Sequence, residues 1–363
     1  MIPNRKPRLD LAQTRTAMTQ ATRPPVVLSP AQPGADASGS PGTLLELPPL
    51  RCADAARMRG EPLHASAVRY SRFLLLEVPG PWGDSALDGK HMDAGVARQL
   101  AAAARAADTH VLLIRRPGRH PSTRTGATNR SAAWAFADTS PGLERVLWGS
   151  WRAPAELLDL DLTAAIPGPA NAAGPQRLAL VCTNGKRDQC CALRGRPVAA
   201  EIASATDWDT WECSHLGGHR FAATMMLLPT GDMFGWLDPE SALEVMQRFD
   251  MGQVMLSRYR GRTGQPVPVQ AALHAAAVRL GDFHRDALRV SDARRIQADG
   301  PEHSADKTEL WEVEVIHRTE HSPGIAYRVI LAGSTQAPTF LSCSDDTLRA
   351  EIRYETHSFS RIE

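Results

Sequence analysis

The sequence predicts an α/β protein. The first observation is a strand–helix–strand pattern in residues 70–114, where apolar runs flank an Ala-rich segment of helical spacing. The second is a β-α-β-β-α pattern in residues 178–249, the order that a thioredoxin-like domain requires. The third is a length of 363 residues, which at about 100–200 residues per domain suggests two or three globular units.

The N-terminal part divides into two segments. Residues 1–48 are rich in Pro, Ser, Thr, Gly and Ala and predict a disordered leader. Residues 49–172 predict an α/β domain, in which the strand–helix–strand order favours a parallel pairing. Its expected elements are a strand at 70–78, a helix at 93–107, a strand at 110–114 and short strands at 132–136 and 145–151.

Residues 173–262 predict the thioredoxin-like domain. A short apolar strand is expected to end at Cys182, and a second short strand is expected just before His215. Pro197 is expected in the first turn of a helix ending at Ser204, where a missing N–H costs nothing. A hairpin is expected over 221–237, and then a helix to about 249 with Asp238 as its N-cap. Residues 263–363 predict an α+β extension, with a helix at 267–280 and strands at 310–317, 326–331 and 339–342.

Composition restricts the class of protein. A net charge of +1 argues against nucleic-acid partners, because phosphate binding needs a sustained positive field. No run approaches the roughly 18–20 apolar residues that span a bilayer, and no signal-peptide pattern is present, so we expect no membrane partner and a cytoplasmic location. Four of the six cysteines lie within about thirty residues, which favours a metal or redox site over a disulfide framework.

The candidate site combines Cys182 and Cys191, which have eight residues between them, with His215 and His219, which have three residues between them. Thiolate and imidazole suit zinc or iron–sulfur centres. The histidine spacing fits a zinc finger, but the cysteine spacing does not. A Rieske centre interleaves its cysteines and histidines, whereas here the cysteines come first. Three nearby glycines, Gly185, Gly217 and Gly218, allow the backbone to approach a bound metal or cluster closely. Three nearby cations, Lys186, Arg187 and Arg220, would favour negative charge added to the site.

These residues resemble the sucrase/ferredoxin-like family. The matching pieces are Arg187-Asp188-x-x-Cys191 after Cys182, then Cys213-Ser-His215-Leu-Gly-Gly-His219-Arg-Phe221-Ala222, with Val78-Pro-Gly-Pro-Trp82-Gly83 upstream and Tyr259-Arg-Gly-Arg-Thr-Gly264 downstream. The resemblance implies a thioredoxin-like ferredoxin domain with a bis-histidine 2Fe–2S cluster. It implies that Cys182 and Cys191 bind one iron and that His215 and His219 bind the other. No paired-carboxylate glycosidase signature accompanies it.

The sequence departs from the family pattern at one position that affects the choice of cysteine ligands. Cys190 directly precedes Cys191, and on spacing alone either thiol reaches the metal. The family's Arg-Asp-x-x-Cys pattern implies Cys191. Cys213 is then expected to be a buried small hydrophobe, and Cys52 and Cys343 to be structural or incidental thiols, because they are far away in the sequence.

The expected function is one-electron transfer coupled to protonation, with unidentified donor and acceptor proteins. A thiol–disulfide redox protein is one alternative, although the vicinal Cys190–Cys191 pair lacks Cys-x-x-Cys spacing. A structural zinc module is the other. The chain contains neither a Gly-x-Ser-x-Gly elbow nor a P-loop, and the sequence leaves open whether it catalyses a reaction.

Overall fold

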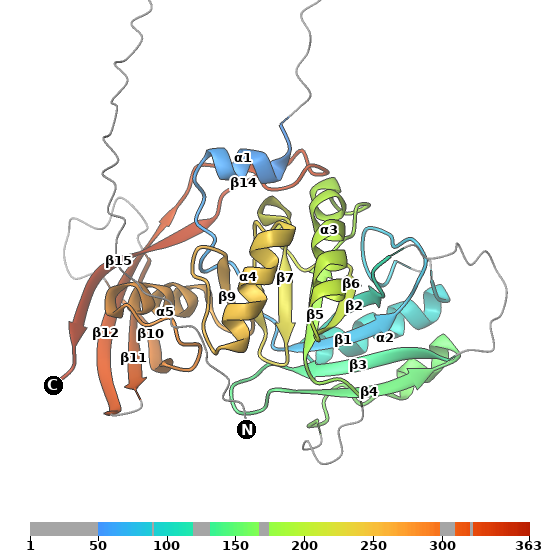
Figure 1. Cartoon of the computed structure of the whole chain (residues 1–363), viewed down its shortest axis with the longest axis horizontal. Helices are drawn as coiled ribbons and strands as arrows, with labels where there is room; N and C mark the ends of the chain where they lie inside the picture. Colours follow the sequence, from blue (N-terminus) through green and yellow to red (C-terminus); the bar gives the residue numbers. More distant parts are fainter. Residues whose placement is uncertain (1–49, 89–90, 119–130, 167–173, 298–308, 320–321) are drawn as a thin grey trace, which may run out of the picture. The chain divides into compact units, whose positions relative to one another are not determined.

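A computed structural model describes residues 50–88, 91–118, 131–166, 174–297, 309–319 and 322–363 (Figure 1). The predicted leader, residues 1–48, lies outside the described residues, as does the middle of the linker before the second predicted domain. The described part is an α/β structure with one large mixed sheet and a separate antiparallel sheet, which confirms the predicted fold class.

The first part of the large sheet contains the predicted strand–helix–strand unit. β1 (Arg72–Glu77) and β2 (Thr109–Arg115) pair in parallel, and α2 (Ala94–Ala106) connects them. The Asp93 side chain caps α2 by accepting hydrogen bonds from two backbone N–H groups. The other elements are α1 (Cys52–Met58), β3 (Ala132–Asp138), β4 (Arg145–Trp151) and the 3₁₀ turn η1 (Pro154–Asp159).

The second part has the order β-α-β-β-β-α, which has one strand more than the predicted β-α-β-β-α order. It contains β5 (Leu178–Cys182), α3 (Gln189–Ala205), β6 (Asp209–Cys213), the 3₁₀ turn η3 (His219–Phe221), β7 (Met225–Leu228), β8 (Asp232–Phe234) and α4 (Pro239–Asp250). Asp238 caps α4 as expected, because its carboxylate accepts from the Ser241 N–H at 2.9 Å. β9 (Tyr259–Arg262), a strand not predicted from the sequence, pairs with β8 at the sheet edge.

The first two predicted domains share a single nine-stranded sheet of order β4-β3-β1-β2-β6-β5-β7-β8-β9. They meet where β2 pairs antiparallel with β6. On each side of this seam the topology is the same, because a parallel pair joined by a helix (β1–β2, β5–β6) continues into two antiparallel strands (β3–β4, β7–β8). The fold therefore repeats a β-α-β-β-β unit, although the sequence shows no fixed-period repeat.

The sequence prediction for α3 was wrong at its start. The helix begins at Gln189, not Pro197, because the carboxylate of Asp188 accepts a hydrogen bond from the Cys190 N–H at 2.8 Å and caps it. Pro197 therefore lies inside the helix. The earlier start places Cys190 and Cys191 in the first turn.

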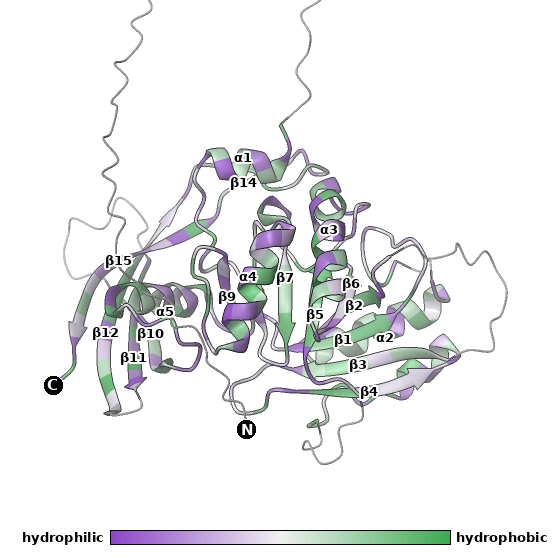
Figure 2. Ribbon diagram, viewed as in Figure 1, coloured by the Kyte–Doolittle hydropathy of each residue, from purple (hydrophilic) through white to green (hydrophobic). Residues whose placement is uncertain are grey.

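The sheet separates two kinds of core. On one face, alternate residues of β1 and β5 pack against α2 and against α3 and α4, respectively. On the other face, strands of both halves form a common core that includes Cys182 and Cys213. The hydrophobic colouring of β1 and β5 reflects this burial on both faces (Figure 2).

The C-terminal part confirms the predicted helix and strands and adds further strands. α5 (Val267–Leu280) packs against the antiparallel sheet formed by β10 (Leu288–Ile296), β11 (Glu309–Thr319), β12 (Ser322–Thr335) and β15 (Ile352–Arg361). β13 (Thr339–Phe340) and β14 (Leu348–Arg349) form a small separate pair. No helix in the described ranges is long and apolar enough to cross a membrane.

Gly195 sets how closely α3 packs on β5. A Cβ atom added at this position would lie 2.1 Å from the carbonyl oxygen of Cys182. We expect Gly195→Ala to push α3 away from the end of β5 and to lower the free energy of unfolding by about 1–3 kcal/mol, measured by urea denaturation. Arg196→Ala, at an exposed position of the same helix, is the control, and an equal effect in both variants would contradict this account.

Candidate metal centre

The structure brings the four sequence-predicted site residues together. Cys182 ends β5, Cys191 lies in the first turn of α3, His215 follows β6, and His219 begins η3. The parallel pairing of β5 with β6 places Cys182 opposite Cys213, so the loop that carries both histidines starts beside Cys182. The packing of α3 on β5 brings Cys191 to the same end of the sheet.

The four side chains contact one another in two pairs. The rings of His215 and His219 stack with centroids 4.2 Å apart, and Cys182 and Cys191 are hydrogen-bonded to each other. The pairs also meet, because the Cys191 Sγ lies 3.9 Å from the His219 Nδ1 and Cys182 is hydrogen-bonded to His215. Two thiols and two imidazoles are therefore in contact with one another, and these are donor types suited to iron–sulfur or zinc chemistry.

The environment sets the protonation of these donors. Hydrogen bonding from the Cys191 thiol holds the pKa of Cys182 well below its usual range, and the same interaction raises the pKa of Cys191. Burial and the neighbouring His215 lower the pKa of His219 to about 4. These pKa shifts favour the thiolate of Cys182 and the neutral imidazole of His219, which are the forms that bind metals.

The loop between the histidines requires glycine. Gly217 and Gly218 both have left-handed backbone conformations, with φ of 79° and 71°. A Cβ atom at Gly218 would also lie 2.6 Å from the Arg260 Nη2. The loop places the Leu216 N–H in a hydrogen bond to the Cys182 sulfur, as the glycine-rich sequence led us to expect for thiolate stabilisation.

Arg260 supports this loop from the protein interior. Its guanidinium donates to the Gly217 carbonyl at 3.0 Å and to the carbonyl and hydroxyl oxygens of Ser66. The side chain is buried, and burial lowers the pKa of Arg260 to about 9. A buried cation behind the cysteine and histidine donors favours negative charge at the centre.

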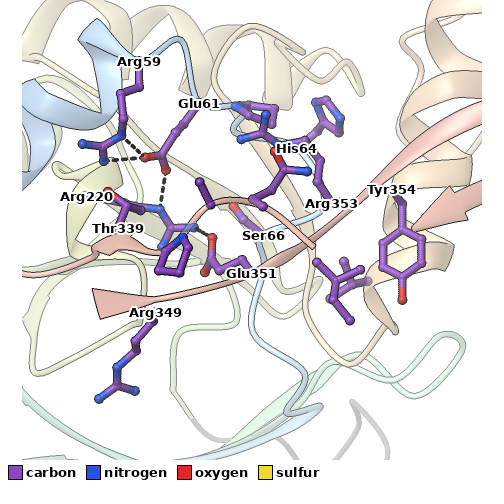
Figure 3. A pocket seen from close by; sticks show the side chains of 17 residues that line it. Arg59, Glu61, His64, Ser66, Arg220, Thr339, Arg349, Glu351, Arg353 and Tyr354 are labelled. Atoms are coloured by element: carbon purple, nitrogen blue, oxygen red, sulfur yellow. Dashed lines mark hydrogen bonds and ion pairs between the residues drawn. The ribbon is translucent and has the colours of Figure 1, made fainter. Parts of the chain in front are cut away.

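Arg220 does not have the role expected from the sequence. Its guanidinium forms ion pairs with Glu61 and Glu351, and both carboxylates compensate its charge (Figure 3). These groups line a cavity of about 470 Å³ with Arg59 and Arg353. Arg220 therefore connects the histidine loop to the C-terminal strands instead of facing the four donors.

Cys190 and Cys191 point to different neighbours. Consecutive residues of a helix are rotated by about 100°, so the two side chains diverge. The Cys190 Sγ lies 3.6 Å from the Sγ atoms of both Cys52 and Cys343, whereas Cys191 contacts the first set of donors. Of the two candidates, the geometry places Cys191 with Cys182, His215 and His219.

Cys52 and Cys343 are not isolated thiols, contrary to the expectation from their sequence distance. With Asp188 and Cys190 they form a second group of potential metal ligands, whose donor atoms all lie within 4.8 Å of one another. Hydrogen bonding with Cys52 lowers the pKa of Cys190 to about 6. Cys213 is buried in the core shared with Cys182 and Cys191, as expected, and burial raises its pKa.

Sequence reasoning missed several residues of this region. Arg260 stands in the quoted Tyr259–Gly264 motif, but nothing in the motif indicates that its side chain turns inward. The sequence position of His110 indicates no role in the site. In the structure, the His110 Nε2 lies 3.4 Å from the His215 carbonyl oxygen, and the His110 ring stacks on Tyr70. The grouping of Cys52 with Cys343 depends on contacts across 291 positions, for which the sequence carries no signal.

The fold and the site define an α/β protein in which two cysteines and two histidines lie together at one end of a large mixed sheet. The sucrase/ferredoxin-like family model matches residues 63–261, more than half of the chain. The chain belongs to this family, which confirms the resemblance seen in the sequence. Searches of curated proteins and of solved structures found no match.

Removing the Arg260 guanidinium tests its supporting role. Arg260→Gln leaves buried carbonyl groups without a charged donor, so we expect the free energy of unfolding to fall by about 2–3 kcal/mol in urea denaturation. Arg260→Lys retains the charge without the forked donors and should give an intermediate loss. Arg289→Gln, at an exposed strand position, should change stability by less than about 0.5 kcal/mol, and a similar loss there would refute the assignment.

Proposed function

We propose that this protein is a one-electron carrier in which Cys182, Cys191, His215 and His219 hold a 2Fe–2S cluster. The observation that carries the proposal is the convergence of two thiols and two imidazoles, from separate loops, at one end of a single sheet. Membership of the sucrase/ferredoxin-like family supports it. When bound, a 2Fe–2S cluster supplies reversible one-electron transfer, at a potential set by its ligands and surroundings.

The two pairs of ligands have different surroundings. Cys182 and Cys191 are each 1% exposed, so the thiolates are shielded from water and oxidants. His215 and the adjacent Gly217 and Gly218 are only half-buried. Electrons and protons are therefore exchanged on the histidine side, where a cavity of about 1060 Å³ borders Gly218 and Tyr70 and offers a donor or acceptor protein access.

The histidines also provide the site for a coupled proton. An imidazole that binds a metal through one ring nitrogen can hold a proton on the other. Neutral imidazole in place of anionic thiolate leaves the site less negative, which raises its potential relative to an all-cysteine site, as in Rieske centres. Adding an electron increases the affinity of the second ring nitrogen for a proton, so reduction and protonation are linked.

The cysteine assignment is tested by single substitutions. Cys182→Ala and Cys191→Ala should lose iron, inorganic sulfide and visible absorption, because each removes a thiolate ligand. Cys190→Ala and Cys213→Ala are matched controls and should retain all three, measured after anaerobic purification, together with an EPR signal on dithionite reduction. Bleaching of Cys190→Ala with an intact Cys191→Ala would reverse the assignment. Zinc in place of iron in the unaltered protein, lost from Cys182→Ala and Cys191→Ala, would establish the structural zinc alternative instead.

Proton coupling is tested by redox titration. The midpoint potential should fall as pH rises through neutrality, by at most about 59 mV per pH unit for one proton per electron. The His215→Cys/His219→Cys double variant should keep the cluster and lose pH dependence, since thiolate has no second ring nitrogen, whereas His357→Gln, at an exposed strand position, should behave like the unaltered protein. A midpoint that does not vary with pH in the unaltered protein would exclude the coupling.

A further inference from the structure

A second group of sulfur and oxygen donors lies beside the first. Cys52 begins α1, Asp188 and Cys190 lie at the start of α3, and Cys343 lies between β13 and β14. The Cys190 Sγ is 3.6 Å from the Sγ of Cys52 and 3.6 Å from the Sγ of Cys343. Three segments that are remote in the sequence thus place three thiols and one carboxylate together.

These separations match a tetrahedral metal site. A zinc–sulfur bond of about 2.3 Å places two thiolates on one tetrahedral zinc about 3.8 Å apart. The two separations from Cys190 are close to this value, and all four donor atoms lie within 4.8 Å of one another. A disulfide bond has a sulfur–sulfur distance of about 2.05 Å, so these thiols are placed as separate donors.

The carboxylate of Asp188 is held by several backbone and side-chain donors. Its Oδ2 accepts from the Cys343 N–H at 2.8 Å and from the Ser342 hydroxyl at 2.9 Å. Its Oδ1 accepts from the Cys190 N–H at 2.8 Å, which leaves a lone pair free for a fourth metal bond. The carboxylate is thus oriented toward the sulfurs before any metal binds.

The negative charge of Asp188 favours a bound cation at this second group of donors. Asp188 is fully buried, and it forms no ion pair with any Lys or Arg in the part of the chain that the structure describes. A buried anion without a compensating charge is costly. Three thiols beside it are donors for a soft or borderline cation, and the backbone N–H groups of Cys52 and Ala53 donate to the sulfurs of Cys343 and Cys190, respectively.

We propose that Cys52, Cys190, Cys343 and Asp188 bind one structural zinc ion, distinct from the Cys182, Cys191, His215 and His219 centre. Four protein ligands leave no open position, which is typical of structural zinc rather than catalytic zinc. Cys343 is exposed, whereas the other three ligands are buried, so the metal enters from the Cys343 side. Cys52 and Cys343 lie outside the family match, so the site extends beyond the family's core region.

The zinc ion stabilises the start of α3. It joins α1 and the β13–β14 segment, which lie together next to this end of α3 (Figure 1). A two-stranded pair of this size has little stability by itself, so the segment depends on this attachment. Because Cys190 directly precedes Cys191, the zinc site and the other centre take donors from the same helical turn.

Metal analysis of the full chain tests this site. The anaerobically purified protein should contain about one zinc per chain, measured by inductively coupled plasma mass spectrometry, in addition to any iron. Cys52→Ser and Cys343→Ser should reduce zinc to background and leave the iron content unchanged. Cys182→Ser is the matched control, because it removes a donor of the first centre only and should retain the zinc. Loss of zinc from Cys182→Ser, with retention in Cys343→Ser, would place the zinc at the first centre and overturn the proposal.

A measurement on the unaltered protein covers variants that fail to fold. Cys52, Cys190 and Cys343 should resist alkylation as purified and become reactive when a chelator removes the zinc, as read by peptide mass spectrometry. Absence of zinc, with these thiols freely alkylated or with a Cys190–Cys343 disulfide, would overturn the proposal. Because iron and zinc are counted separately, this result does not depend on whether the first centre holds a 2Fe–2S cluster.

Discussion

The first turn of α3 is the constraint on which both donor groups depend. Asp188 caps the helix, and Gly195, about two turns later, allows the helix to lie against the Cys182 carbonyl. With the helix fixed at both points, Cys190 and Cys191 project in different directions from adjacent positions. Neighbouring thiols therefore serve different groups, and a small shift of this turn alters both.

The β2–β6 pairing gives the site a continuous support. Two β-α-β-β-β units meet at this antiparallel seam, and their strands share the core on the face that includes Cys182. The His215 loop leaves β6 beside this seam, where His110 of β2 approaches its carbonyl oxygen. The first half of the sheet carries none of the four proposed ligands, yet it positions the loop that holds two of them.

In the proposed electron carrier, the difference in burial between the two thiols and His215 determines the side from which a partner reaches the site. The thiols belong to the shared core, whereas His215 and the glycines after it are half-buried, and their loop is held from inside by Arg260. A charge buried beneath a glycine loop stabilises negative charge without blocking the surface. In the proposed site, the two thiols are thereby shielded from water while the His215 side chain stays partly exposed.

The sequence by itself determined the α/β class, most of the strands and helices, and the family. These features depend on local periodicity, on capping residues such as Asp93 and Asp238, and on motifs of closely spaced residues. The four proposed ligands of the first centre were also named from the sequence, because they lie in two short segments with recognisable motifs. The missed strands β10 and β15 carry many exposed polar residues, so their apolar pattern is weak.

Only the tertiary structure decided the single sheet, the early start of α3 and the grouping of Cys52 with Cys190 and Cys343. Each depends on contacts between residues far apart in the chain, which leave no local pattern. The same holds for Arg220, whose partners Glu61 and Glu351 come from opposite ends of the described chain. Side-chain direction at a helix start, and the packing of remote segments against it, are set by folding of the whole chain, so spacing along the sequence cannot reveal them.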